Sequence, residues 1–303
     1  MLDVHQLKIF AAVAENLSFT RAAERLFLTQ SAVSHQIARL EREIGCPLLE
    51  RQGRAVTLTA AGREMATQAR RVFAAVDEAM LAAAHAGRPN IGRLRIGASS
   101  TACQYIIPEA LREFRECFPG YSLAIIPGDS PATAERVANG EVDLGLMVRL
   151  DRQKNLTYHE LFDDELLFLV SPLHPWAKTG KVERKELAEQ HMVLYSRNSA
   201  TFRLVERYFL KMRVPLRDWI ELGDMGAIKE LVKLGLGVSV TGEWTARPEL
   251  KEKSLVLLPV PGSRLHRSWC IANAAGREIS MAEQTFIGLC QAVARDLVVG
   301  RRQ

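Results

Sequence analysis

The stretch TQSAVSHQIARLE, residues 29–41, has the residue spacing of a helix with one narrow apolar face. At about 100° per residue, Val33, Ile37, Leu40 and Ile44 fall within an arc of roughly 60°. Most of the remaining circumference is polar: Gln30, Ser31, Ser34, His35 and Arg42. Such a helix can bury only its apolar stripe against a core. Its polar face has to stay in contact with solvent or with a polar partner.

Two shorter helical segments precede this helix. The first spans about residues 5–15, and Ser18 is placed to cap the second, SFTRAAERL, whose alanines let another helix approach closely. A turn at Phe27-Leu28 and a cap at Thr29 follow. This order is typical of a helix-turn-helix, whose second helix enters the major groove of DNA; a small three-helix domain of another kind is the alternative. The predicted apolar face of the first helix consists of Leu7, Phe10, Ala11 and Ala14.

A short hairpin is predicted after the two-faced helix. Gly45-Cys46-Pro47 ends the helix, and residues 48–58 alternate around a turn at Gln52-Gly53. This hairpin carries Arg51 and Arg54, whose charges suit phosphate contacts. Residues 1–71 hold ten Lys/Arg and seven Asp/Glu, a net charge of +3, so a basic surface here depends on arrangement rather than on excess charge.

A long helix is predicted from Thr59 to His85, before a break at Gly87-Arg88-Pro89-Asn90. Its apolar residues recur at alternating spacings of four and three, which is the seam of a coiled coil and needs a partner helix. Packing inside its own domain is the alternative. The predicted seam consists of Met65, Ala69, Val72, Val76, Ala79 and Ala83.

The run FAAVAENLSFTRAAERLFLTQSAVSHQIARLEREIGCPLLERQGRAVTLTAAG resembles the N-terminal signature of the LysR-type transcriptional regulators and covers nearly all of residues 2–62. The resemblance implies a winged helix-turn-helix over residues 1–58, a linker and dimerisation helix over 59–87, and an effector-binding domain over 88–303. It also implies double-stranded DNA with a pseudo-palindromic operator as a partner, a homodimer or homotetramer, and contact with RNA polymerase.

The recognition surface is predicted from the polar arc and the hairpin. We expect Gln30, Ser31, Ser34 and His35 to face base edges, and Arg39, Arg51 and Arg54 to meet phosphates or the minor groove. Ser31 stands where the family often has Pro, and His35 where it often has Arg. The base preference therefore does not carry over from the family.

Strand and helix patterns alternate from Leu94 onward, which predicts an α/β domain with a parallel sheet. Two such series in tandem, without a nucleotide-binding fingerprint, resemble the two lobes of a periplasmic-binding-protein-like domain. The predicted lobes are residues 92–162 with 267–303, and residues 163–266.

Ligands in such sheets bind at the carboxyl ends of strands. Hydroxyl-rich loops occupy the matching points of both lobes, which predicts a small anion, most simply a carboxylate metabolite, as the effector. Plain helix capping is the alternative for these hydroxyls. The candidate residues are Ser99, Ser100, Thr101, Ser130 and Arg149 in the first lobe, and Ser199, Thr201 and Arg203 in the second.

Composition bounds the remaining possibilities. The chain of 303 residues has a formal charge of +5, no basic-then-apolar leader and no apolar run of about 20 residues, so we expect a cytoplasmic protein without a membrane partner. Five cysteines without a CxxC pair predict no structural metal, and nothing in the sequence calls for a cofactor. No nucleophile elbow or phosphate-binding loop indicates an enzyme.

Two other functions remain open. A solute-binding transport component would share the two-lobed domain, although residues 1–62 argue against it. A redox-sensing regulator of the same fold would need cysteines that can meet. Cys103 lies near a predicted helix start, where a lowered thiol pKa is conceivable.

Overall fold

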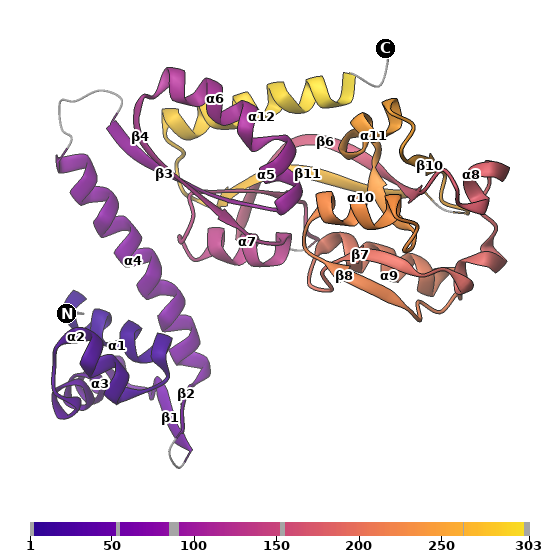
Figure 1. The fold of residues 1–303 in the computed structure, drawn as a ribbon. Helices are drawn as coiled ribbons and strands as arrows, with labels where there is room; N and C mark the ends of the chain where they lie inside the picture. The colour runs from indigo at the N-terminus through magenta and orange to yellow at the C-terminus, as the bar shows by residue number, and fades with distance from the viewer. Residues whose placement is uncertain (1–2, 53–54, 85–90, 152–154, 263, 300–303) are drawn as a thin grey trace. The chain divides into compact units, whose positions relative to one another are not determined.

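The computed structural model describes residues 3–52, 55–84, 91–151, 155–262 and 264–299. The chain divides into two compact units, one formed by residues 1–87 with 139–141 and the other by the remainder. The elements of the first unit are labelled in Figure 1. They are α1 (Val4–Asn16), α2 (Phe19–Leu26), α3 (Gln30–Ile44), β1 (Leu49–Gln52), β2 (Ala55–Leu58) and α4 (Ala60–Ala84).

The predicted helix caps are confirmed. The Ser18 side chain accepts a hydrogen bond from Arg21 N, and the Thr29 side chain accepts one from Ala32 N. Gly45 ends α3 with a φ of 82°, in the left-handed region that favours glycine. These local signals set the lengths of α2 and α3.

The core of this unit follows the narrow stripe of α3. Val33, Ile37 and Leu40 are buried as predicted, but Ile44 is exposed, because α3 ends there and the chain turns away at its cap. The predicted face of α1 is wrong in detail. Ala11 and Ala14 are only half-buried, and the face is rotated toward a larger buried set: Gln6, Leu7, Ile9, Phe10, Ala12 and Val13.

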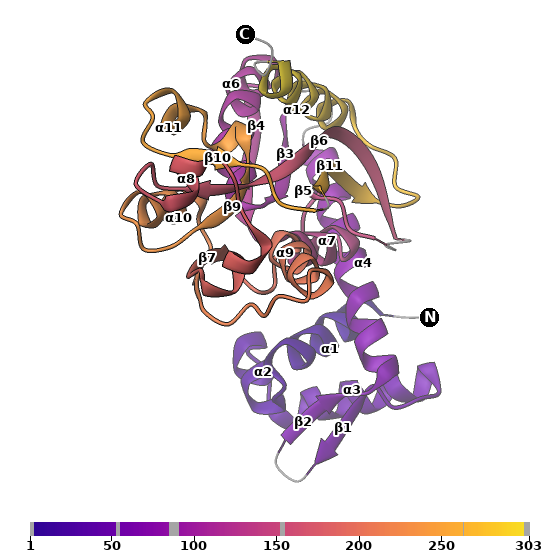
Figure 2. The same cartoon turned by 90° about the vertical axis from the view of Figure 1, so that its right-hand side faces the viewer.

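The hairpin is fastened to α3. Strands β1 and β2 pair antiparallel from Leu49↔Leu58 to Gln52↔Ala55, and Figure 2 shows them beside α3. Glu41 Oε1, on α3, accepts hydrogen bonds from Leu48 N at 2.8 Å and Leu49 N at 3.1 Å. The carboxylate of Glu41 therefore fixes where the β1–β2 hairpin, the wing of this unit, begins relative to α3.

We expect Gly62→Ala to destabilise the first unit, although Ala is the better helix former by about 1 kcal/mol. A Cβ on Gly62 would lie 1.9 Å from Leu48 O, and that backbone oxygen already accepts a bond from Thr59 N. Relieving the clash has to shift the wing or α4, so we expect a net loss of about 1–3 kcal/mol. Thermal unfolding of the variant beside Gly288→Ala, whose added Cβ meets no neighbour within 4 Å, checks this; equal stability of the two variants contradicts it.

The seam of α4 divides into two parts. Ala69 is buried and α4 packs against α1, so the beginning of the predicted seam belongs to its own domain, as the alternative held. Farther along, Val72, Val76 and Met80 are exposed on the single chain, Met80 by 67%. An intermolecular seam is therefore restricted to this second part of the helix.

The second unit contains two sheets. The larger has the strand order β10-β6-β11-β5-β3-β4, with β9 also pairing with β6, and the smaller pairs β7 with β8. The strands are β3 (Ile91–Ala98), β4 (Gly120–Pro127), β5 (Leu144–Val148), β6 (Leu156–Val170), β7 (Met192–Tyr195), β8 (Trp219–Leu222), β9 (Ser239–Gly242), β10 (Val256–Leu258) and β11 (Leu265–Ala274).

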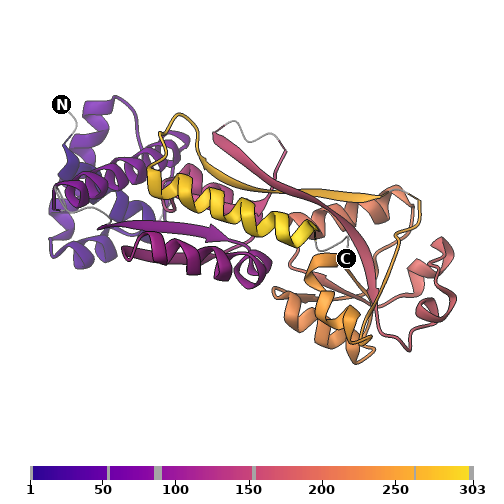
Figure 3. The ribbon, with the colours of Figure 1, turned by 90° about the horizontal axis from the view of Figure 1, so that it is seen from above.

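The predicted parallel sheet is correct for part of this unit. Strands β4, β3 and β5 are parallel, as are β7 and β8, whereas β6 and β11 pair antiparallel with each other along their lengths. Figure 3 shows these two long strands running side by side. Contrary to the sequence prediction, these two strands are not parallel, because each connects the two lobes. Strand β6 leads from the first lobe to the second and β11 leads back, so they run in opposite directions.

Helices cover both lobes. Two helices rather than one lie between Ser99 and Phe118, because Pro108 lacks an N–H and begins a new helix. The helices are α5 (Ser100–Tyr105), α6 (Ile107–Cys117), α7 (Ser130–Ala138), α8 (Pro175–Thr179), α9 (Ala200–Lys211), α10 (Met225–Lys233), α11 (Arg247–Lys251) and α12 (Met281–Val299), with 3-10 turns η1 (Arg184–Glu189) and η2 (Glu243–Thr245).

Each lobe has its own core. In the first, Phe114 of α6 meets Phe286 of α12 edge-to-face with ring centroids 5.8 Å apart. In the second, Phe168 of β6 packs on Trp176 with centroids 5.3 Å apart. The lobes are thus separate hydrophobic clusters joined by shared strands.

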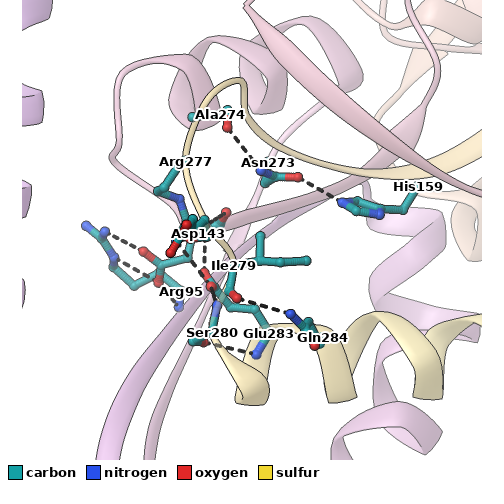
Figure 4. Close-up of polar contacts among 11 residues, drawn as sticks. Arg95, Asp143, His159, Asn273, Ala274, Arg277, Ile279, Ser280, Glu283 and Gln284 are labelled. Atoms are coloured by element: carbon teal, nitrogen blue, oxygen red, sulfur yellow. Dashed lines mark hydrogen bonds and ion pairs between the residues drawn. The ribbon is translucent and has the colours of Figure 1, made fainter.

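A polar network anchors α12 to the sheet of the first lobe (Figure 4). Arg277 donates to both carboxylate oxygens of Glu283, at 3.1 and 2.6 Å, and to Asp143 O at 3.0 Å. Glu283 Oε2 accepts from Ser280 N while Ser280 Oγ accepts from Glu283 N, which is a capping box. Asp143 also pairs with Arg95 at 2.6 Å, so the start of α12 is joined to β3 and β5.

Candidate effector and DNA-binding sites

A pocket of about 290 Å³, here called the inner pocket, is lined by residues of both lobes. It brings together all six hydroxyl residues predicted from the sequence. Tyr195, Asp129, Arg267 and Trp269 also line it. The predicted hydroxyl residues in its wall are Ser99, Ser100, Thr101, Ser130, Ser199 and Thr201.

Most of these hydroxyls act as hydrogen-bond acceptors within the protein. Ser99 and Ser199 cap α5 and α9, accepting from Ala102 N and Phe202 N, as the capping alternative held. Ser130 Oγ accepts from Val148 N at 3.1 Å, and Thr201 Oγ1 accepts from Arg267 at 2.8 Å. A hydroxyl that accepts one hydrogen bond keeps its own O–H to donate. The wall can therefore donate several O–H groups to a ligand.

Arg267, which the sequence analysis missed, is buried in the wall of the pocket. Its Nε and NH2 groups donate to Asp164 at 2.8 and 2.7 Å, and its guanidinium lies 5.1 Å from the centre of the Trp269 ring. Burial opposes the charge, but the Asp164 carboxylate outweighs this and raises the pKa of Arg267. The signal was hidden because the surrounding sequence, RSWCIAN, has the pattern of an ordinary buried strand.

Two buried donors in the wall of the pocket lack partners among the described residues. They are the Trp269 indole N–H and the Tyr195 hydroxyl. Burial raises the pKa of Tyr195, against smaller lowering influences of Arg267, Thr101 and Thr241, none of which meets the phenol with hydrogen-bond geometry. Buried polar groups are normally satisfied, so these two point to a functional rather than a purely structural wall.

The two predicted arginines lie elsewhere. Arg149 and Arg203 line a neighbouring groove of about 850 Å³, which shares Val148, Ala200 and Arg267 with the inner pocket. Arg149 pairs with Glu160 at 2.7 Å. The structure therefore does not bring these arginines together with the hydroxyls in the inner pocket.

Direct hydrogen bonds join α5 of the first lobe to the second lobe. Ser100 Oγ donates to Gly223 O at 2.7 Å, and Tyr105 OH donates to Thr245 O at 2.8 Å. Lys229 donates to the same phenol at 2.9 Å and pairs with Glu249 at 2.7 Å. Burial would lower the pKa of Lys229, but its bonds with Glu249 and Tyr105 outweigh burial and raise it. Both ends of α5 are thus bonded to the opposite lobe, and its first residue also lines the pocket.

The candidate DNA surface lies on α3 of the first unit. Gln30, Ser31, His35 and Arg39 are exposed and Ser34 is half-buried. Arg39 also pairs with Glu43 one turn later, at 3.4 Å. For the wing, the backbone of Arg51 belongs to β1, but its side chain and all of Arg54 lie outside the described residues.

Phe27 is an unexpected feature beside this surface. It lies in the turn before α3 with a φ of 55°, and its side chain is 96% exposed. A single exposed aromatic side chain does not by itself mark an interaction surface, but Phe27 directly precedes the candidate DNA surface of α3. Its sequence position alone indicated only a turn.

Burial disfavours the thiolate form of three cysteines in the second unit. Burial raises the pKa of Cys103, so the lowered pKa conceivable from its position is wrong. Burial also raises the pKa of Cys270 to about 12 and raises that of Cys290. Because the thiolate is the reactive form, the raised pKa values of Cys103, Cys270 and Cys290 do not favour the redox-sensing alternative at these three positions.

The described residues contain no group of His, Cys, Asp and Glu that could hold a metal ion. Within the same residues, no helix is long and apolar enough to cross a membrane.

Comparison with known families decides the class of protein. Residues 4–63 match the bacterial regulatory helix-turn-helix protein of the lysR family, and residues 87–295 match the LysR substrate binding domain. The chain belongs to the LysR family. This LysR-family protein is a DNA-binding transcriptional regulator that carries a domain for a small-molecule effector.

Individual relatives agree over nearly the whole length. The chain is 31% identical to the HTH-type transcriptional activator CmpR of Synechocystis, over 94% of this chain and 93% of that protein. It is 32% identical to the RuBisCO operon transcriptional regulator of Allochromatium vinosum, over 94% of each chain. Among solved structures, the Synechocystis PCC6803 CcmR regulatory domain in complex with 2-PG is 29% identical, covers 68% of this chain and 98% of its own, and has a TM-score of 0.61.

Proposed function

We propose that the effector of this LysR-family regulator is a small organic anion bound in the inner pocket between the two lobes. The observation that carries this proposal is the set of hydroxyls in the wall that accept hydrogen bonds from the protein and keep their O–H groups to donate. A ligand rich in acceptor oxygens matches such a wall, and a carboxylate forms the stronger, charge-assisted bonds. The volume is at the lower end of ligand pockets, which favours a small metabolite.

One chemical guide is the CcmR regulatory domain, which was solved with 2-PG. We propose 2-PG and small carboxylic acids as the first compounds to test on this chain. To act as a signal, the ligand has to prefer one arrangement of lobes or subunits, and a coupling of about 1–3 kcal/mol would change DNA affinity about 5- to 150-fold.

A thermal-shift screen of the full chain tests the effector proposal. Organic acids and 2-PG are expected to raise the melting temperature, while neutral analogues of the same acids are not. Ser130→Ala with Thr201→Ala is expected to abolish the shift, since it removes from each lobe one hydroxyl that accepts within the protein and keeps its O–H for a ligand. The matched control is Ser122→Ala with Thr157→Ala, which removes the same groups from exposed strand positions. Hits confined to neutral compounds, or an anion shift untouched by the pocket variant, refute the proposal.

We propose that the polar face of α3 reads the operator. Gln30, Ser31, Ser34 and His35 are assigned to base edges and Arg39 to phosphate, with Arg51 and Arg54 of the wing assigned to phosphate or the minor groove. Exposure of four of the five α3 residues supports this assignment. Phe27 is added at the edge of the surface, where its ring can pack on a sugar or a thymine methyl group.

We propose a homodimer through the second part of α4, which contacts between the C-terminal effector domains would double to a tetramer. Exposed Val72, Val76 and Met80 support the seam. Two-fold symmetry then calls for a pseudo-palindromic operator, and RNA polymerase is the expected further partner.

The domain boundaries that we propose are 1–58, 59–87 and 88–303, with lobes at 92–162 plus 267–303 and at 163–266. Because its partner is the chromosome, we place the protein in the cytoplasm.

A further inference from the structure

A buried cation in the wall of the inner pocket is already matched by a carboxylate. Arg267 and Asp164 are both almost fully buried, with two hydrogen bonds of 2.7–2.8 Å between them. Asp164 Oδ2 also accepts a bond from the Trp244 indole N–H at 2.8 Å, which holds the carboxylate in place. The pair therefore adds no net charge to the pocket.

Arg267 nevertheless keeps donor capacity. A guanidinium has five N–H groups, of which Arg267 uses two for Asp164 and one for Thr201 Oγ1. Two N–H groups remain, on a residue that lines the pocket. The Trp269 indole N–H beneath the guanidinium is also without an acceptor among the described residues. The two remaining guanidinium N–H groups are donors that an acceptor oxygen of a ligand can satisfy.

We propose that Arg267 anchors the effector and that Asp164 sets the charge of the group seated there, accepting a carboxylate and disfavouring a doubly charged phosphoryl group. This inference rests on the proposed function, because it concerns the same pocket. With a monoanion, the cluster of Arg267, Asp164 and ligand carries one negative charge. With a dianion it carries two, and little water is present to screen them from Asp164.

The wall offers little further compensation. Asp129 is a second acidic residue of the inner pocket, and its side chain caps α7 by accepting from Ala132 N. The arginines that could neutralise a dianion, Arg149 and Arg203, lie in the neighbouring groove. A ligand that carries both kinds of group is therefore oriented with its carboxylate at Arg267.

Isothermal titration of the full chain at pH 8 with two simple probes, glycolate and inorganic phosphate, tests this orientation. The wild-type protein is expected to bind glycolate more tightly than phosphate. Asp164→Asn leaves the guanidinium unmatched, so phosphate affinity is expected to rise by about tenfold or more while glycolate gains less. The double variant Asp164→Asn with Arg267→Gln again has no net charge in the pair. It is expected to lose the gain for phosphate and to bind glycolate about tenfold more weakly than the wild type.

The outcomes separate the two proposals. If the wild type binds neither probe nor any acid of the thermal-shift screen, the anionic effector itself is refuted. If glycolate binds but Asp164→Asn leaves the ratio of the two affinities unchanged, the role of Asp164 is refuted and the pocket assignment stands. Should Asp164→Asn fail to fold, the wild-type comparison and the charge-neutral double variant still decide: tighter phosphate than glycolate in the wild type, or undiminished glycolate affinity in the double variant, overturns the inference.

Discussion

Replacing both Val72 and Val76 by Asp is expected to dissociate the dimer of this LysR-family regulator and to reduce operator affinity by at least about 10³-fold. Both side chains are exposed on the single chain, so the charges cost little there. Across a two-fold seam the same substitutions bring four carboxylates together without counter-charges. Burying an unpaired charge costs several kcal/mol, which exceeds the gain from a few Val and Met contacts.

Light scattering and gel-shift titration measure this outcome. The matched control is Val72→Thr with Val76→Thr, which keeps the β-branched shape and adds no charge; it is expected to weaken the dimer only moderately. Circular dichroism of both variants checks that α4 remains helical, because Asp also has a lower helix propensity than most residues. An unchanged oligomer in the Asp variant, with α4 intact, excludes the proposed seam.

The fold of the first unit was predictable because its signals are local. The caps Ser18 and Thr29 and the left-handed Gly45 each act within a few residues of their own position. The exposed Ile44 and the early part of the α4 seam were not predictable in the same way. Both depend on where a neighbouring element ends or packs, which periodicity within one helix does not contain.

The inner pocket was predictable only in part, for a related reason. Hydroxyl residues at helix starts follow the ends of strands, so their convergence at one edge of the lobes follows from topology. Arg267 lies near the start of β11 and Asp164 in the middle of β6, and their pairing depends on the long antiparallel crossing between the lobes. Arg149 and Arg203 illustrate the opposite limit, because a sequence does not tell toward which of two neighbouring hollows an exposed arginine extends.

The recognition face of α3 leads to the last prediction. Replacing Gln30 and His35 by Ala is expected to cost about 2–6 kcal/mol on the operator if the two effects add, and little on random DNA. The reason is that base-edge hydrogen bonds distinguish sequences, whereas phosphate contacts do not. Arg39→Ala provides the contrast: it is expected to weaken binding to both DNAs alike and to reduce the slope of log affinity against log salt by about 1.

Fluorescence anisotropy with operator and scrambled duplexes at several salt concentrations measures the affinity for the operator, the affinity for random DNA and the salt slope. The control variant, His5→Ala with Gln284→Ala, removes the same residue types from exposed positions outside α3 and is expected to bind as the wild type does. Operator affinity that stays at the wild-type value in that variant would move base reading away from Gln30 and His35, toward Ser31, Ser34 or the turn that carries Phe27.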